Sequence, residues 1–147
     1  MFSYIFRNLW KKNRHTFKNK FKFSQEKAEE AVRLFRENFR DKGIFENTPY
    51  NGIKEVLAKL KTAGYVLVIA TSKPEEFAIR IAKHFELDKY FELICGSTFD
   101  ETRNKKHQVI KYAIERLNES YDIPVNEILM VGDRHHDIDG ARLNGID

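Results

Sequence analysis

Two aspartates lie four residues apart just after an apolar run near the end of the chain. The stretch ILMVGDRHHDIDGA, residues 128–141, leads four apolar residues into Gly132 and Asp133, and Asp137 follows. A buried carboxylate is costly unless a partner compensates its charge, so a strand that ends in Gly-Asp predicts a site that holds a cation. Two hard oxygen ligands suit Mg²⁺, which keeps water positions free for a phosphate. The structural alternative is that Asp137 is a helix N-cap and Asp133 a turn residue.

Two histidines stand between these aspartates and suggest a second chemistry, that of zinc. His135 and His136 are adjacent in the sequence, and imidazole is a common zinc ligand. Neither a cysteine nor a third well-placed ligand accompanies them, so we interpret both as solvent-facing loop residues.

Hydroxyl and ammonium groups occur at two further positions where an element is expected to begin or end. Thr71 and Ser72 follow an apolar run and precede Pro74, and hydroxyls with free backbone N–H groups at a helix start can bind phosphate. The alternative is that Thr71 only caps that helix. Lys105 and Lys106 open another expected helix, where the helix dipole disfavours a cation. A lysine in this position suggests a nearby anion, although exposed lysines are tolerated there.

The elements that must position these groups alternate between strand and helix from residue 51 onward. We expect strands over 65–71, 91–97 and 127–133, and helices over 51–64, 75–85, 105–117 and 137–147. Continuous apolar strands between amphipathic helices predict an α/β fold, a Rossmann-like parallel sheet flanked by helices. Ligands of such sheets bind beyond the carboxyl ends of the strands, where Thr71, Ser72 and Asp133 fall. The preceding segment 24–50 is helical, with Ser24 as N-cap and Gly43 as stop.

The order of these motifs resembles the haloacid dehalogenase-like phosphatase superfamily, and within it the phosphoglycolate phosphatase-like branch. VIATSKP (68–74) is similar to the second motif of the family, KKHQVI (105–110) to the third and MVGDRHHD (130–137) to the fourth. Three motifs in order at these separations form a specific signal. The resemblance covers residues 24–147, because GIFENTPYNGIKEVL and GARLNGI are similar too.

The resemblance implies a Mg²⁺-dependent phosphatase acting on a small phosphorylated metabolite. Thr71 would hydrogen-bond the phosphoryl group, and Lys106, rather than Lys105, would neutralise its charge and that of the nucleophile. Ser72 is a phosphate-binding candidate from its position before the expected helix alone. Asp133 would bind Mg²⁺ directly or through water, and Asp137 would hold the water shell or the lysine. These roles suit phosphoryl transfer, which depends on positioning and electrostatic stabilisation.

The first motif of the family, Asp-x-Asp-Gly-Thr, is not found in this sequence. No Asp-x-Asp precedes residue 133, although the motif supplies the nucleophile that forms an aspartyl phosphate. The opening MFSYIFRNLW resembles the first strand of the family, with Asn8 and Trp10 where the two aspartates would stand. We therefore expect a truncated or internally deleted copy with impaired activity, or a non-catalytic remnant that binds phosphate and Mg²⁺.

The resemblance divides the chain into three parts. Residues 1–23 form a basic and aromatic segment with a first-strand remnant at 2–6, residues 24–50 a helical cap remnant, and residues 51–147 an incomplete α/β core. Residues 1–22 hold seven of the 26 Lys and Arg residues and none of the 22 acids. This could indicate binding to nucleic acid or to an acidic membrane, but a solvated chain end is the favoured interpretation.

Composition sets the cellular setting that we expect. The chain has 147 residues and 41% hydrophobic residues, which is typical of one globular domain. No apolar run approaches the length of a transmembrane helix or of a signal-peptide core. Cys95 is the single cysteine and is expected to be a buried small hydrophobe. We therefore expect a cytoplasmic protein with neither nucleic acid nor membrane as a partner, and the sequence leaves its oligomeric state undetermined.

Overall fold

The computed structural model describes residues 17–100 and 102–147. The chain divides into two compact units, residues 1–48 and 49–147, which are described separately. The predicted first-strand remnant at 2–6, with Asn8 and Trp10, lies outside the described residues. No helix in the described ranges is long and apolar enough to cross a membrane.

The first unit contains the predicted amphipathic helix. Helix α2 (Gln25–Asn38) begins where expected, because the Ser24 hydroxyl accepts a hydrogen bond of 3.3 Å from the Lys27 amide. The helix continues as a π-helical turn, η1 (Phe39–Gly43). Phe35 and Phe39, one turn apart, stack with ring centroids 5.6 Å apart, which places two of the predicted apolar residues on one face.

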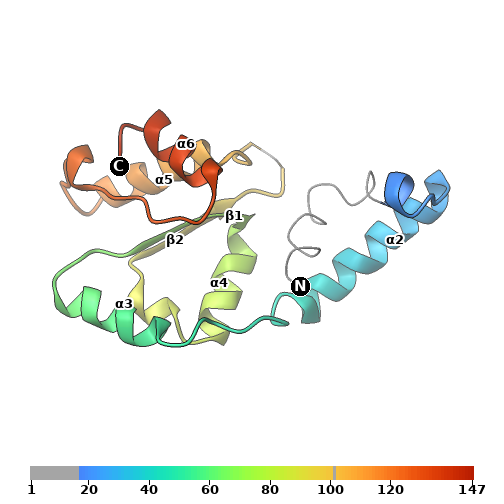
Figure 1. The fold of residues 1–147 in the computed structure, drawn as a ribbon, viewed down its shortest axis with the longest axis horizontal. Coiled ribbons are helices and arrows are strands. Elements are labelled where there is room, and N and C mark those ends of the chain that lie inside the picture. Colours follow the sequence, from blue (N-terminus) through green and yellow to red (C-terminus); the bar gives the residue numbers. More distant parts are fainter. Residues whose placement is uncertain (1–16, 101) are drawn as a thin grey trace. The chain divides into compact units, whose positions relative to one another are not determined.

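The second unit is built on a parallel pair of strands. Strands β1 (Val68–Pro74) and β2 (Leu93–Ser97) run in register, with Val68, Ile69 and Ala70 opposite Leu93, Ile94 and Cys95. The remaining elements are α3 (Ile53–Thr62), α4 (Glu75–His84), η2 (Asp88–Tyr90), α5 (Lys106–Asn118), η3 (Val125–Glu127) and α6 (His135–Leu143). Figure 1 places α3 and α4 on one side of the sheet and α5 and α6 on the other. The predicted α/β class with a parallel sheet flanked by helices is confirmed.

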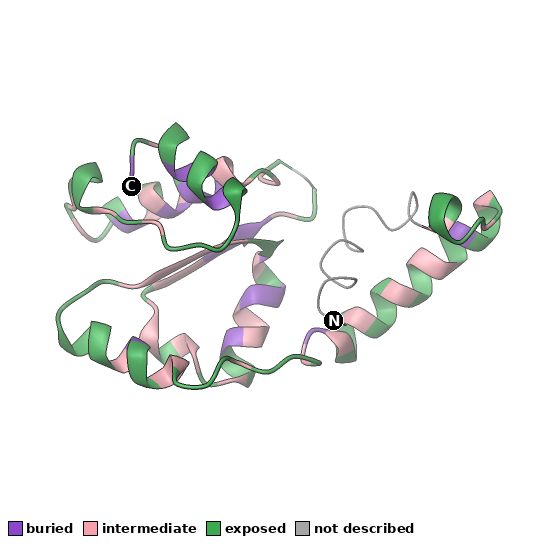
Figure 2. Cartoon of the chain, in the orientation of Figure 1, coloured by how far each residue is buried: buried purple, intermediate pink, exposed green. Residues whose placement is uncertain are grey.

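The core follows from the alternation of side chains along the strands. Cys95, Val109 and Ala113 form a buried cluster against which Val68, Ala70 and Leu93 pack, so one residue in two of each strand faces α5. On the other side of the sheet, α4 buries Phe77, Ala78 and Ala82. Figure 2 shows buried stretches, in purple, on the helices that lie beside the sheet.

A second cluster attaches α6 to α5. Its buried members are Ile110, Ala141 and Ile146, and Ile128 and Met130 pack against it. The C-terminal end is held by a backbone bond of 2.6 Å from the Met130 amide to the Asp147 carbonyl. The segment before α6 therefore lies against the α5–α6 layer.

The predicted third strand at 127–133 is wrong for the described part of the chain. Only two strands are present in that part, and residues 128–132 pair with neither. The segment still alternates as a strand would: Ile128 and Met130 pack inward, whereas Leu129 and Val131 are 70% and 84% exposed. An apolar run indicates extended chain, but a strand also requires a neighbour that completes its ladder of backbone hydrogen bonds.

Candidate functional site

An ion pair joins the first turns of α5 and α6. The Lys106 Nζ atom lies 2.8 Å from Asp137 Oδ1, and the two side chains are only 14% and 10% exposed. A lysine at a helix start suggested a nearby anion, and Asp137 is such an anion. Its negative charge offsets the repulsion between the ammonium group and the N-terminal dipole of α5.

The same lysine reaches the sheet. Lys106 Nζ donates a second hydrogen bond, also of 2.8 Å, to the backbone carbonyl of Ala70 in β1. Ala70 immediately precedes Thr71, so one ammonium group ties β1, α5 and α6 together beside the predicted hydroxyl. An ammonium has three N–H donors, and the contacts found among the described residues engage two of them.

Two glycines allow this close approach. A Cβ atom on Gly140 would lie 2.8 Å from Ile110 Cδ1 and 3.0 Å from Lys106 Cγ. A Cβ atom on Gly132 would lie 2.6 Å from Asp137 Cγ. A Cβ atom at Gly132 would collide with the base of the Asp137 side chain, so Asp137 can keep its position only if residue 132 is glycine, whereas at Gly140 the buried end of the Ile110 side chain would have to move.

Asp137 also stabilises the start of its own helix. Its Oδ2 atom accepts a hydrogen bond of 3.3 Å from the Arg134 amide, and its own amide donates to the Arg134 carbonyl at 2.9 Å. Asp137 is the third residue of α6 rather than its N-cap. Asp137 therefore stabilises the helix start from the third position and not as the N-cap that the structural alternative expected, and it contacts Lys106 as well.

The other predicted residues lie at the carboxyl end of β1 or before α6. The half-buried Thr71 accepts a hydrogen bond of 3.2 Å at Oγ1 from the Lys73 amide, and the Ser72 side chain is exposed. β1 continues to Pro74, with an irregular register between Ala70 and Pro74 that includes both hydroxyl residues. Such irregularities redirect side chains near functional sites. Asp133 is exposed beside Gly132.

The two aspartates differ in how well they suit Mg²⁺. Asp133 offers an exposed carboxylate of the kind that Mg²⁺ prefers. Asp137 is nearly buried, and its charge is already neutralised by Lys106. These residues fit a hydrated Mg²⁺ ion held mainly at Asp133, while Asp137 acts on the lysine.

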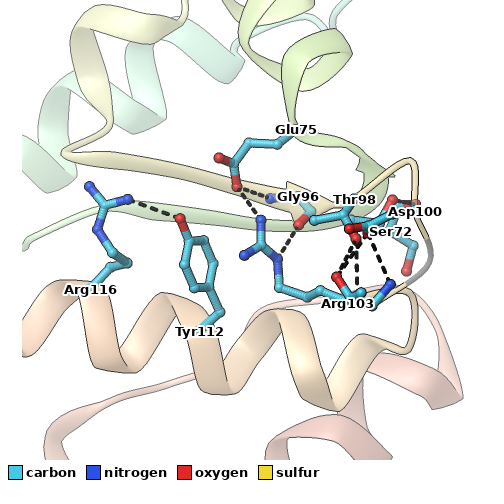
Figure 3. A network of polar contacts seen from close by, with 10 residues as sticks. Ser72, Glu75, Gly96, Thr98, Asp100, Arg103, Tyr112 and Arg116 are labelled. Carbon is cyan, nitrogen blue, oxygen red and sulfur yellow. Dashed lines mark hydrogen bonds and ion pairs between the residues drawn. The ribbon is translucent and has the colours of Figure 1, made fainter.

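The sequence did not predict a polar network that joins the end of β2, the start of α4 and the segment before α5. Figure 3 shows it around Arg103, whose Nε donates to the Gly96 carbonyl at 2.9 Å and whose NH2 lies 3.0 Å from Glu75 Oε2. Glu75 Oε2 also accepts from the Gly96 amide at 3.0 Å. The guanidinium lies over the Tyr112 ring, 3.5 Å from its centroid. These groups are distant in sequence, so only the fold brings them together.

A local turn completes the network, and its signal was present in the sequence. Asp100 Oδ1 accepts from the Thr102 amide at 3.1 Å and from the Thr102 hydroxyl at 2.8 Å, as an aspartate does when it forms a turn with the backbone two residues on. The pKa of Asp100 is lowered by its hydrogen bond with the Thr98 hydroxyl and then by those from Thr102. The Arg103 amide in turn donates to Thr98 Oγ1 at 3.1 Å. Side chains of Thr98 and Asp100 therefore hold Thr102 and Arg103, before Lys106, by hydrogen bonds to their amides.

The two histidines lie at the surface, and a third side chain lies close to them. His135 and His136 are exposed, as expected. They are the first two residues of α6 rather than loop residues. The carboxylate of Asp139 lies near both rings, with one ligand atom of each residue within 4.8 Å of the others. The sequence did not reveal that the next helical turn places this third side chain of a metal-binding type beside the two histidines.

Comparisons with known proteins identify the family of the chain. The sequence model of the haloacid dehalogenase-like hydrolase family matches residues 5–147. A 5'-nucleotidase from Pseudomonas aeruginosa is 41% identical over 88% of this chain and 57% of its own length. The tyrosine-protein kinase PtkA from Mycobacterium tuberculosis is 42% identical over 83% of this chain and 40% of its own. Relatives named phosphoglycolate phosphatase and pyrophosphatase PpaX also match.

A solved structure gives the same result at the level of the fold. The crystal structure of a Clostridium difficile protein superimposes with a TM-score of 0.82 and 47% identity, over 92% of this chain and 61% of that one. The chain therefore spans between two fifths and about three fifths of the length of these relatives. The matched family, the order of the motifs and the common fold show that the chain belongs to the haloacid dehalogenase-like hydrolases.

Proposed function

We propose that the reaction of this lineage is Mg²⁺-dependent hydrolysis of a small phosphomonoester, and that the carboxyl end of β1 is where phosphate binds. The observation that supports this most directly is the position of Lys106, bonded to both Asp137 and the Ala70 carbonyl beside Thr71. The printed names of relatives, 5'-nucleotidase and phosphoglycolate phosphatase, support the same class of substrate.

The proposed roles follow from the contacts of each residue. The third N–H of Lys106 would donate to a phosphoryl oxygen, because the other two point at Asp137 and Ala70. Thr71 and Ser72 would supply hydroxyl and backbone donors at the strand end. Asp133 would hold Mg²⁺, with Asp137 acting on the ion through its water shell and on the lysine. The bound ion would supply positive charge that neutralises the phosphoryl oxygens.

Asp137 also determines the direction of the lysine. An ammonium on a flexible four-carbon stem samples many positions unless something holds it. Contacts of 2.8 Å to a carboxylate and to a backbone carbonyl restrict Lys106 before any ligand arrives. The entropy of ordering that side chain is then not lost when phosphate binds, which favours affinity.

We further propose that the 147-residue chain turns over its substrate poorly or not at all. Hydrolysis through an aspartyl phosphate needs a nucleophilic carboxylate, and no Asp-x-Asp precedes residue 133. The Lys106–Asp137 pair is independent of that motif, so the chain would still bind phosphate and Mg²⁺. The buried Cys95 fits a reducing, cytoplasmic setting, which is part of this proposal.

Calorimetric titration with inorganic phosphate in the presence of Mg²⁺ tests the binding site. Thr71→Val and Lys106→Gln should each weaken phosphate binding by about tenfold or more, since hydrogen bonds to charged groups contribute about 1.5–3 kcal/mol. Lys105→Gln is the matched control, because Lys105 is exposed and adjacent in sequence. It should bind phosphate as the unmodified chain does, and equal losses in both lysine variants would contradict the assignment.

Turnover of p-nitrophenyl phosphate tests the impairment separately. We expect Mg²⁺-dependent release of nitrophenol no faster than in Asp133→Asn. Turnover that is lost in Asp133→Asn would overturn the impairment and leave the phosphatase assignment in place. Absence of both turnover and phosphate binding would overturn the proposed site itself.

A further inference from the structure

Three side chains of the types that bind metal ions gather on the exposed side of the first two turns of α6. His135 and His136 open the helix, and Asp139 follows His135 by four residues, which is one helical turn. The two imidazole rings lie with centroids 3.8 Å apart and planes inclined at 48°. A nitrogen of each ring and a carboxylate oxygen of Asp139 all lie within 4.8 Å of one another.

The limit of 4.8 Å on these separations is wider than the spacing of ligands around one ion. Two ligands at about 2.1 Å from a tetrahedral zinc ion are about 3.4 Å apart. The three side chains are exposed, so small rotations about their side-chain bonds can close the difference without moving the backbone. Asp137, between them in sequence, is turned inward to Lys106 and is not part of the group.

The chemistry of the donors selects the class of ion. Two imidazoles with one carboxylate suit zinc and the neighbouring divalent transition metals, whereas Mg²⁺ prefers oxygen ligands alone. Three protein ligands leave a fourth position for water or an anion. The dipole at the start of α6 opposes a cation, and the Asp139 carboxylate offsets part of that repulsion.

We propose that His135, His136 and Asp139 form a binding site for a divalent transition-metal ion of the zinc class. The site is distinct from the proposed magnesium position at Asp133, and it does not rest on the proposed function. It uses a face of α6 opposite to the one that Asp137 directs toward α5.

Calorimetric titration of the tag-free chain with Zn²⁺ tests the site. We expect one ion per chain, with affinity retained in a large excess of Mg²⁺. His135→Ala, His136→Ala and Asp139→Asn should each weaken Zn²⁺ binding by about tenfold or more, because even groups that only orient metal ligands contribute about that much. Circular dichroism of each variant shows whether the helix content of the whole chain is retained.

Matched controls identify the ligands. His84→Ala and His107→Ala remove histidines outside the group, and Asp133→Asn removes the proposed magnesium ligand. All three should bind Zn²⁺ as the unmodified chain does. The site would be overturned if Zn²⁺ produced no heat and displaced no indicator dye. It would also be overturned if His84→Ala or His107→Ala lost as much Zn²⁺ affinity as His135→Ala. Loss in Asp133→Asn with none in His135→Ala would assign the ion to the other position and also overturn it.

A spectroscopic measurement gives an independent result. Cu²⁺ bound at the site should show electron paramagnetic resonance splitting from two nitrogen ligands, and His136→Ala should reduce this to one. Splitting that does not change in His135→Ala and His136→Ala would contradict the proposed ligands.

Discussion

Lys106 Nζ lies 2.8 Å from Asp137 Oδ1, although the two residues are far apart in the sequence. Both side chains are nearly buried where the first turns of α5 and α6 meet. Because Asp137 also accepts from the Arg134 amide and Lys106 also donates to Ala70, the pair fixes the beginning of α6, the beginning of α5 and the end of β1 together. The candidate phosphate site and the packing of the second unit therefore depend on the same contact.

Removing one partner of this pair should destabilise the protein. Asp137→Ala leaves a largely buried ammonium without its anion, and we expect a loss of about 3 kcal/mol in the free energy of unfolding, as for other buried pairs. Urea unfolding followed by circular dichroism measures the change. Glu30→Ala breaks the exposed pair with Arg33 and serves as the control, which should unfold at nearly the same urea concentration as the unmodified chain. Equal stability of Asp137→Ala and the unmodified chain would contradict the structural role of the pair.

Gly140→Ala distinguishes packing from helix propensity. Alanine is favoured over glycine within a helix by up to about 1 kcal/mol, so propensity alone predicts stabilisation. The added Cβ would instead lie 2.8 Å from Ile110 Cδ1. Because Ile110 is buried, its side chain has little room to move aside, and we expect destabilisation of about 1–3 kcal/mol, as in other overpacked cores. Thermal and urea unfolding give the sign directly.

Gly43→Ala is the companion variant for this test. There the added Cβ would lie 3.2 Å from Phe39 Cδ2, an atom of a side chain that can move aside. Gly43→Ala should be neutral or stabilising. If Gly140→Ala is stabilising too, α5 and α6 are not as closely packed as described.

Arg103→Lys should weaken the loop that precedes α5. Lysine cannot bond both Glu75 and Gly96 in the forked geometry of a guanidinium, nor lie flat over Tyr112. We expect a loss of about 2 kcal/mol in the free energy of unfolding, with faster hydrogen exchange at the Gly96 and Arg103 amides. Arg116→Lys changes a more exposed arginine that also contacts Tyr112, and a loss as large as that of Arg103→Lys would contradict the importance of the Glu75 contact.

Cys95 should be unreactive in the folded protein. Its side chain lies in the core, and burial, with a smaller effect of the Glu75 charge, raises the pKa of its thiol from 9.0 to about 11. Dithionitrobenzoate at pH 8 should therefore react slowly with the native chain and rapidly with the chain in urea, because thiolate is the reactive form. Fast labelling of the native chain would contradict the burial of Cys95.

The same shift predicts how stability changes at high pH. Above about pH 9 the thiol of the unfolded chain ionises, whereas the folded thiol stays neutral until about pH 11. Stability due to Cys95 is therefore complete below pH 9 and is lost as the pH rises toward 11. Cys95→Ala should show a smaller decline in urea midpoint over this interval than the unmodified chain.

Local signals in the sequence were sufficient for the helices and for the class of fold. Ser24 begins α2 because its hydroxyl can satisfy a free amide at the helix start, which depends only on neighbouring residues. The apolar runs before Thr71 and through Cys95 predicted the two paired strands. The unfavourable position of a lysine at the start of α5 also indicated an anion, which the structure identifies as Asp137.

The sequence could not decide contacts between distant segments. Residues 128–132 have the composition of a strand, but whether a neighbour completes the ladder is a property of the whole fold, and in the described part of the chain none does. Only the fold could show that Arg103 lies between Glu75 and Tyr112, and that Lys106, which the family resemblance already favoured over Lys105, also reaches the Ala70 carbonyl. The sequence by itself determined which residues could do chemistry and the elements that carry them. The tertiary structure decided which of them meet, because hydrogen bonds and ion pairs act over a few ångströms and only packing brings side chains from separate elements within that distance.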